Sequence, residues 1–266
     1  MSKSLLLASA LLIGATLTAT AAPILVNGGF EDHASTYTAS TEFGADFNGY
    51  GGQGVTGWTA TGFALYYFGG TQTSVSAANY YNDPKTYFRN GTNLGDNANN
   101  SGPAVPVSPN GGNFIALDGD SSFQCGTGCK SPGASISQTV MGLTAGQHYD
   151  VSFYWAGTQL INRNGATTER LAVTFGGEQQ STNAVSVASG GFSGWMQATL
   201  SFTASSASQA LTFLSYGTPE GLPPVALLDG VSVTATVPEP TSWALVTAGL
   251  LGLGWAMRRR RGVNAA

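Results

Sequence analysis

Apolar and polar side chains alternate strictly along several stretches in the middle of the chain. Residues 151–155, 171–175 and 200–203 place every second side chain on one apolar side, which is the period of a half-buried β-strand. No helical period persists outside the two ends of the chain. The pattern predicts an all-β fold, a single antiparallel β-sandwich of the jelly-roll type. Further short runs bounded by Gly, Pro, Asn or Ser are also predicted as strands, at residues 23–27, 62–68, 113–117, 135–140, 210–215 and 225–236.

Residues 80–113 interrupt this pattern with a Gly-, Asn- and Pro-rich stretch of little periodicity. Lys85 and Arg89 are its only positive charges. Loops of this length in compact domains are usually either functional or mobile. We therefore expect a binding region here, with a disordered insertion as the alternative.

The N-terminal end has the pattern of a signal peptide. An uncharged, Leu- and Ala-rich stretch follows Lys3 and ends at Ala19-Thr20-Ala21, the small-residue pattern that a signal peptidase cleaves. A transmembrane helix is the alternative, but the apolar run is short and a cleavage site follows it. We predict export and removal of residues 1–21.

The C-terminal end combines a proline motif, an uncharged span and a basic cluster. Pro238-Glu239-Pro240 precedes residues 241–257, which carry no charge, and Arg258, Arg259, Arg260 and Arg261 follow. A helix of that length at about 1.5 Å per residue measures about 26 Å, close to the ~30 Å hydrocarbon core of a bilayer. A membrane helix at about 241–257 is predicted, with the arginines on the cytoplasmic side.

This three-part tail, residues 237–266, resembles the PEP-CTERM sorting signal. The resemblance implies an exosortase-type membrane protease as partner, cleavage near Pro-Glu-Pro, and an exopolysaccharide-producing Gram-negative source. The protein would then pass the inner membrane, stay anchored there transiently, and reach the cell surface or extracellular matrix. A permanent single-span anchor is the alternative interpretation.

Composition narrows the function classes further. Only 9% of the 266 residues are charged, and glycine alone contributes 37, which excludes a coiled coil or a charge-rich helical bundle. Without its two ends, the domain at residues 22–236 keeps five basic and thirteen acidic residues, a net charge of −8. Nucleic acid and anionic membrane surfaces are therefore poor partners for it.

Short motifs inside the domain resemble the galactose-binding-like β-sandwiches of carbohydrate-binding modules. The resemblance implies a non-catalytic module in which the opening and closing strands lie side by side. Glu31 and Asp229 would then be neighbours, and a structural calcium ion is the implied cofactor, although many such domains lack it. Calcium takes 6–8 oxygen ligands at about 2.3–2.6 Å. The motifs are Asn27-Gly28-Gly29-Phe30-Glu31, Gly57-Trp58-Thr59, residues 136–140, residues 143–149 and residues 228–233.

Cys125 and Cys129 are the only cysteines. Export to an oxidising compartment favours a disulfide between them. So short a ring would fix the shape of a loop more than the stability of the fold. A metal or redox role is the alternative, but no further ligand accompanies the pair.

Sugar binding requires flat aromatic faces together with polar groups for the hydroxyls. Trp155 and Trp195 are expected in the core instead. For each candidate the alternative is packing within the fold. The candidates by loop or strand-edge position are Trp58, Tyr66, Tyr67, Tyr80, Tyr81 and Tyr87.

No catalytic constellation is recognised in the sequence. Gly119-Asp120-Ser121 is typical of a turn, and His148 lies in a turn that enters a strand. The chain is interpreted as an exported, non-catalytic protein associated with extracellular polysaccharide. The alternatives are a structural matrix protein without a specific ligand, or a glycan-directed hydrolase with two carboxylates about 5–10 Å apart in a cleft.

Overall fold

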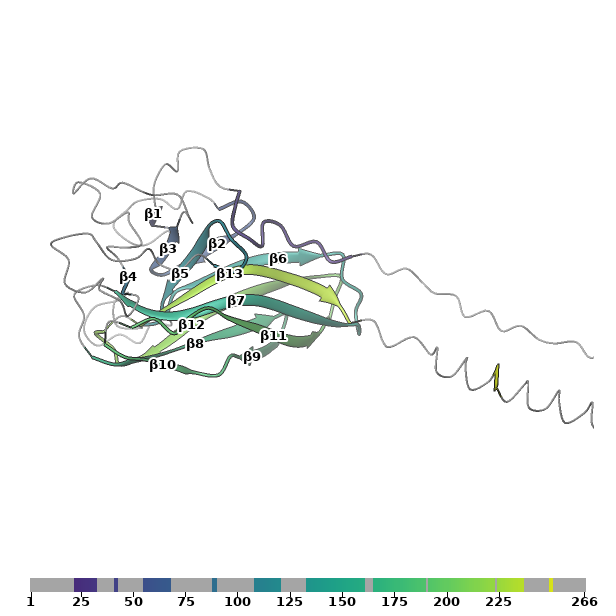
Figure 1. Cartoon of the computed structure of the whole chain (residues 1–266). Helices are drawn as coiled ribbons and strands as arrows, with labels where there is room; N and C mark the ends of the chain where they lie inside the picture. Colours follow the sequence, from purple (N-terminus) through teal and green to yellow (C-terminus); the bar gives the residue numbers. More distant parts are fainter. Residues whose placement is uncertain are drawn as a thin grey trace, which may run out of the picture.

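Two antiparallel sheets packed face to face form the body of the protein in the computed structural model (Figure 1). All strand pairs in the described part of the chain are antiparallel, as the sequence pattern predicts. The structure describes residues 22–32, 41–42, 55–67, 88–89, 108–120, 133–160, 165–189, 191–222, 224–236 and 249–250.

The larger sheet has seven strands and holds the longest strands at its centre. β4 (Phe88–Arg89) pairs with β7 beside the main path. The order along the path is β1 (Thr41–Glu42), β3 (Ala64–Tyr67), β5 (Phe114–Asp118), β13 (Pro224–Ala235), β7 (His148–Leu160) and β11 (Met196–Thr203).

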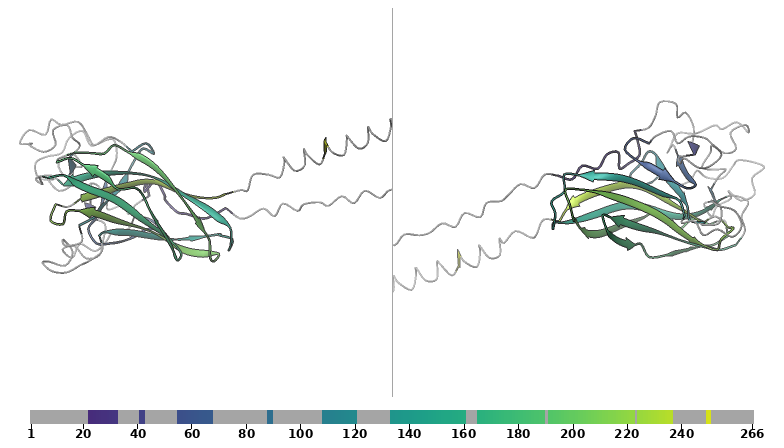
Figure 2. Two further views of the ribbon diagram at one scale, coloured as in Figure 1. Left: turned by 90° about the horizontal axis from the view of Figure 1, so that it is seen from below. Right: turned by 180° about the vertical axis from the view of Figure 1, so that it is seen from behind.

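The smaller sheet has six strands. β9 (Glu178–Ser181) pairs with β8 beside the main path. The order along the path is β10 (Val185–Val187), β8 (Thr167–Phe175), β12 (Ser208–Thr218), β6 (Ser135–Met141) and β2 (Thr59–Thr61). Figure 2 shows this sheet and its partner from below and from behind.

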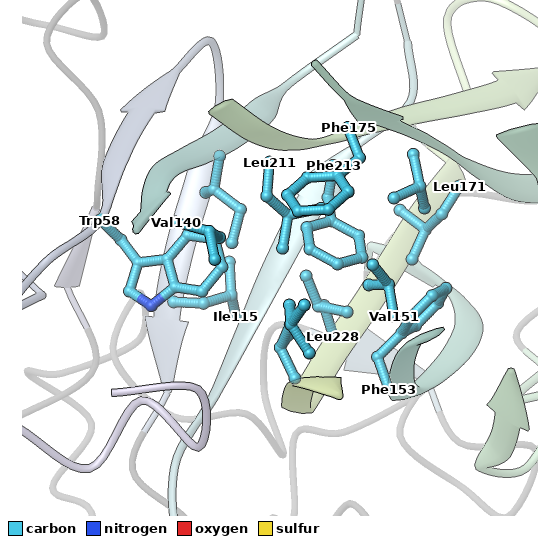
Figure 3. Packing of buried hydrophobic residues seen from close by; sticks show 14 of the residues in the cluster. Trp58, Ile115, Val140, Val151, Phe153, Leu171, Phe175, Leu211, Phe213 and Leu228 are labelled. Atoms are coloured by element: carbon cyan, nitrogen blue, oxygen red, sulfur yellow. The ribbon is translucent and has the colours of Figure 1, made fainter. Parts of the chain in front are cut away.

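The core lies between the sheets and is built by the alternation read from the sequence. On β7, Tyr149, Val151, Phe153 and Trp155 are all buried. Phe153 meets Phe213 of β12 edge to face at 5.0 Å between ring centroids (Figure 3). Aromatic pairs of this geometry add to the hydrophobic burial of their area. The prediction that Trp155 lies in the core is confirmed.

A second apolar cluster lies on the outer side of the larger sheet. Alternate residues of β13 point outward there, and Val225 and Leu227 are as buried as the inward-facing Leu228. Trp195 packs against this cluster and meets Phe114 at 5.6 Å. The first half of β13 is therefore buried on both faces, which explains its nearly continuous apolar sequence.

The predicted strand at residues 23–27 is wrong in its detail. The segment makes a single β-bridge, between Ile24 and Met141. Val26 instead exchanges two hydrogen bonds with the side chain of Gln138: its N–H donates to Oε1 (2.6 Å), and its carbonyl accepts from Nε2 (2.8 Å). Asn27 then adopts a left-handed conformation (φ 53°), which ends any ladder.

Parts of the predicted 80–113 loop are also ordered. It contains β4 and a turn in which Gly111 donates to the carbonyl of Ser108 at 2.8 Å. The rest of that stretch lies outside the described residues.

Candidate functional site

The motif at residues 27–31 forms a tight turn that its asparagine closes. Asn27 Nδ2 donates to the carbonyls of Asp32 (2.7 Å) and Thr56 (3.1 Å), and its Oδ1 accepts from the Asp32 N–H at 3.0 Å. Asn27 and Phe30 both have positive φ, and asparagine tolerates this conformation better than most residues do. The turn brings the residues that follow it to the larger sheet.

Trp58 lies in the core rather than at a surface. Its side chain is 5% exposed and contacts Phe30 at 5.3 Å and Phe213 at 6.3 Å between ring centroids. Its indole N–H donates to the carbonyl of Asn27 at 3.0 Å. Trp58 therefore holds the 27–31 turn from the core side, and its ring packs against other side chains of the protein.

Glu31 leaves this turn and is held by the 108–113 turn. Its carboxylate accepts the backbone N–H of Asn113 at 2.7 Å and the side-chain Nδ2 of the same residue at 2.9 Å. Gly112 allows this approach, because a Cβ there would lie 1.7 Å from Glu31 Oε1. The carboxylate thus has a fixed position although the residue is exposed.

Asp229 lies beside Glu31, at a bulge in β13. The register with β7 shifts between Asp229 and Ser232, and Gly230 has a φ of 59°. Asp229 Oδ1 accepts from the Gly230 N–H (2.6 Å) and from Asn110 Nδ2 (3.3 Å). The prediction that the opening and closing segments meet is thus matched by the structure. The carboxylate site is the name used below for the group of Glu31, Ser108, Asn110, Asn113 and Asp229.

The Asp229 carboxyl is fully buried, and its Oδ2 has no hydrogen-bond partner. Burial, helped by the negative charge of Glu31, raises its pKa to about 7, while hydrogen bonds from Ser108, Gly230 and Asn110 oppose that rise. A cation placed against Oδ2 would remove this electrostatic penalty.

The donor set fits a hard cation. Two carboxylates, an asparagine amide and a serine hydroxyl are oxygen ligands of the kind that calcium prefers. Within the described ranges no group of three or more His, Cys, Asp or Glu side chains comes together, so backbone carbonyls or water would complete the coordination. Asp229 is fully buried, whereas Glu31 is exposed.

The remaining predicted site residues fall outside what the structure describes. Tyr66 and Tyr67 belong to β3 through their backbones, opposite Ile115 and Phe114, and their side chains are not described. The others outside the described residues are Tyr80, Tyr81, Tyr87, Cys125, Cys129, Pro238, Glu239, Pro240, Arg258, Arg259, Arg260 and Arg261.

A second buried carboxyl was missed by the sequence reading. Glu169 of β8 is 1% exposed, accepts a hydrogen bond from Thr167 Oγ1, and leaves its Oε2 without a partner. Burial raises its pKa to about 8, and the hydrogen bond from Thr167 opposes that rise. The signal was available: Glu169 has the same parity as the buried Leu171, Val173 and Phe175, but the predicted strand began only at residue 171.

The outer face of the smaller sheet carries hydroxyl groups and one aromatic ring that the sequence reading also missed. Arg170 lies over the ring of Tyr216 at 4.9 Å, directly across the β8–β12 pairing. Thr61 and Ser135 hydrogen bond at 2.7 Å on the same face. At the β2–β6 end a cleft opens, lined by Val26, Gly57, Thr59, Ser137, Gln138, Thr139 and Ala210.

Thr236 directly follows β13 and is the last residue of the domain that the structure describes. Its N–H and its hydroxyl both donate to the His148 carbonyl at 3.0 Å, and its carbonyl accepts from Gln147 Nε2 at 2.7 Å. Thr236 is thus fixed to the turn that enters β7. Among the described residues, which include only 249 and 250 of the predicted span, no helix is long and apolar enough to cross a membrane.

Two family models match the chain. Residues 107–234 match the family described as Protein of unknown function (DUF642), and residues 236–261 match the PEP-CTERM protein-sorting motif. The chain therefore carries a PEP-CTERM sorting motif at its C-terminus, as predicted. No curated protein matches its sequence.

Several solved carbohydrate-binding modules are similar to the chain at low identity. TmCBM61 in complex with β-1,4-galactotriose is 14% identical (TM-score 0.33; 80% of this chain and 97% of that chain). The CBM22-1 xylan-binding domain from Paenibacillus barcinonensis Xyn10C is 12% identical (TM-score 0.34; 75% of this chain and 94% of that chain). The EclA C-terminal domain, described as a sugar-binding protein, is 17% identical with a TM-score of 0.29. That match covers 37% of this chain and 64% of that chain.

Proposed function

We propose that this protein is exported, processed by an exosortase-type protease at its C-terminal tail, and associated with extracellular polysaccharide through a non-catalytic β-sandwich. The observation that carries the proposal is the position of the sorting motif. The match begins at residue 236, where the last strand has just ended and Thr236 is fixed to the folded body. The sorting motif therefore begins where the described domain ends.

The described surface supports a glycan partner rather than a charged polymer. The outer face of β8, β12, β6 and β2 presents threonine and serine hydroxyls, the Tyr216 ring and a single cation, Arg170. Hydroxyls and an aromatic face are the groups that neutral sugars use in hydrogen bonding and stacking. A net charge of −8 for the domain disfavours anionic partners.

Two measurements test the proposal. Intact masses of the cell-associated and released forms should differ by the mass of the tail, and a released form that retains residues 237–266 would contradict processing. A glycan array with residues 22–236 should give binding that Tyr216→Ala weakens by about tenfold, the loss of roughly one stacking contact. Tyr154→Ala, on the outer face of the other sheet, is the matched control. No binding at millimolar glycan would favour the structural matrix alternative.

A further inference from the structure

Three large apolar side chains are exposed together at one end of the sandwich. Within residues 22–236, as far as they are described, Ile24 is 51% exposed, Val26 42% and Met141 50%, and no other large hydrophobic side chain is classed as exposed. Ile24 and Met141 are bridge partners, with N–O distances of 2.8 and 3.3 Å. Leu25, between Ile24 and Val26, turns inward and packs on the core. Ile24, Val26 and Met141 are called the apolar patch.

The patch lies at the end of the sandwich from which both chain ends leave. Gly142 directly follows Met141, and a Cβ there would lie 2.9 Å from the Ala22 carbonyl. The same connection continues to Gln147 and His148, which hold Thr236. β6 and β13 accordingly both end at the right of Figure 1.

Little chain separates this end from the predicted membrane span. Five residue-to-residue steps lead from Thr236 across residues 237–240 to Thr241, where the uncharged run begins. At about 3.3–3.6 Å per residue they reach at most about 18 Å. The patch is therefore held close to the bilayer for as long as the tail remains inserted.

We propose that the apolar patch rests on the lipid surface while the tail is attached, so that the domain stands with this end toward the membrane. This inference rests on the proposed function, because it requires the tail to insert. A net charge of −8 gives no attraction to anionic lipid, so the contact is apolar. Tethering raises the effective concentration of the patch at the surface, and a weak contact is then sufficient. Cleavage of the tail releases it.

Methionine oxidation tests this contact without a mutation. Residues 22–266 are reconstituted in phosphatidylcholine vesicles, and oxidation by hydrogen peroxide is followed by mass spectrometry. Oxidation of Met141 should slow by about threefold or more relative to the free 22–236 domain, because oxidation follows exposure. Met196 is the internal reference, since it lies seven residues along β11 from Thr203, about 23 Å from this end.

Two variants sharpen the test. Ile24→Ser with Val26→Ser should restore the oxidation rate of Met141 in vesicles, whereas Ile24→Leu with Val26→Ile should keep the protection. Equal Met141 rates in vesicle-bound and free protein would overturn the inference alone. A chain that fails to sediment with the vesicles would overturn the inserted tail as well. Protection that rises with the concentration of the free domain would assign the patch to a second copy and overturn the lipid contact.

Discussion

Two glycines in this sandwich lie where another residue's oxygen comes close. A Cβ on Gly157 would lie 2.9 Å from Glu169 Oε2, and one on Gly28 would lie 1.9 Å from the Val231 carbonyl oxygen. Each glycine thus makes room for a polar group that is buried or hydrogen bonded. The two buried carboxyls, Glu169 and Asp229, are the residues whose protonation is most strongly coupled to folding.

Glu169 should make the domain less stable as the pH rises. Its pKa of about 8 in the folded state exceeds the ordinary value of 4.5, so its contribution to the free energy of unfolding is fully present below pH 4.5. The contribution is lost as the pH rises through 8, at up to about 1.4 kcal/mol per pH unit. Urea titrations between pH 5 and 8 should show this slope in the wild type and a smaller one in Glu169→Gln, in which Asp229 still contributes up to about pH 7. Glu178→Gln, at an exposed glutamate, should keep the slope.

Asp229 should couple stability to calcium. At about 100 times the dissociation constant, bound calcium adds about 2.7 kcal/mol, which corresponds to a rise in Tm of about 5–10 °C for a domain of this size. The rise should be largest above pH 7, where the proton no longer competes for the carboxyl. Differential scanning calorimetry with calcium and with a chelator measures it. Asp229→Asn should abolish the rise and Asp150→Asn should not; a chelator-insensitive Tm in the wild type would refute the calcium site.

At the scale of elements, the bulge in β13 organises the carboxylate site. It shifts the register after Asp229 and brings the N–H of Val231 to the carbonyl of Gly28 at 2.8 Å. The 27–31 turn, the 108–113 turn and the bulge therefore support one another. A disturbance of any one of them should spread to the other two.

Gly28→Ala should break this junction. The added Cβ would lie 1.9 Å from the Val231 oxygen, which is backbone and not free to rotate away. We expect a loss of about 2–4 kcal/mol in the free energy of unfolding, the range of overpacked or strained sites. Gly177→Ala is the matched control, because nothing lies within 4 Å of its Cβ position. Similar urea midpoints for the two variants would contradict the close contact.

Strands whose faces differ in burial could be predicted from the sequence, and others could not. β7 and β12 alternate clearly because one face is buried and the other meets solvent. β9 is short and polar, and β10 has only three residues, so neither leaves a periodic signal. The 23–27 segment resembles a strand, but the Gln138 side chain replaces the ladder, and side-chain pairing of this kind is not visible in a pattern.

Some site residues could likewise be predicted from the sequence, and others could not. The proximity of Glu31 to Asp229 followed from a family resemblance, whereas the burial of Trp58 depends on Phe30 and Phe213, which are distant in sequence. Tyr216 lies on the exposed face of a strand whose other face is core, so parity along β12 could have found it.

At the scale of the whole molecule, one core joins both sheets of the described domain. The cluster between the sheets includes residues from β2, β5, β6, β7, β8, β11, β12 and β13. Such a core should unfold as a unit. The described members of this core all lie between residues 25 and 235.

Removal of residues 237–266 should therefore leave the Tm of the domain unchanged within about 2 °C, which is below 1 kcal/mol for a protein of this size. Truncation after Val231 removes the end of β13, including the buried Val233, and should prevent folding. Circular dichroism and tryptophan fluorescence of both truncated chains measure this. For the chain that ends at Thr236, the thermal transitions seen by the two methods should coincide. A large loss of Tm in the chain that ends at Thr236 would show that the tail packs on the sandwich.

The fixed residue Thr236 also gives the molecule a direction. The described domain begins at Ala22 and ends at Thr236 at one end of the sandwich, and β4 and β10 lie at the opposite end (Figure 1). If the tail is inserted in a membrane, as proposed, every copy presents this opposite end to its surroundings. Cleavage of the tail would then release the domain with that end unchanged.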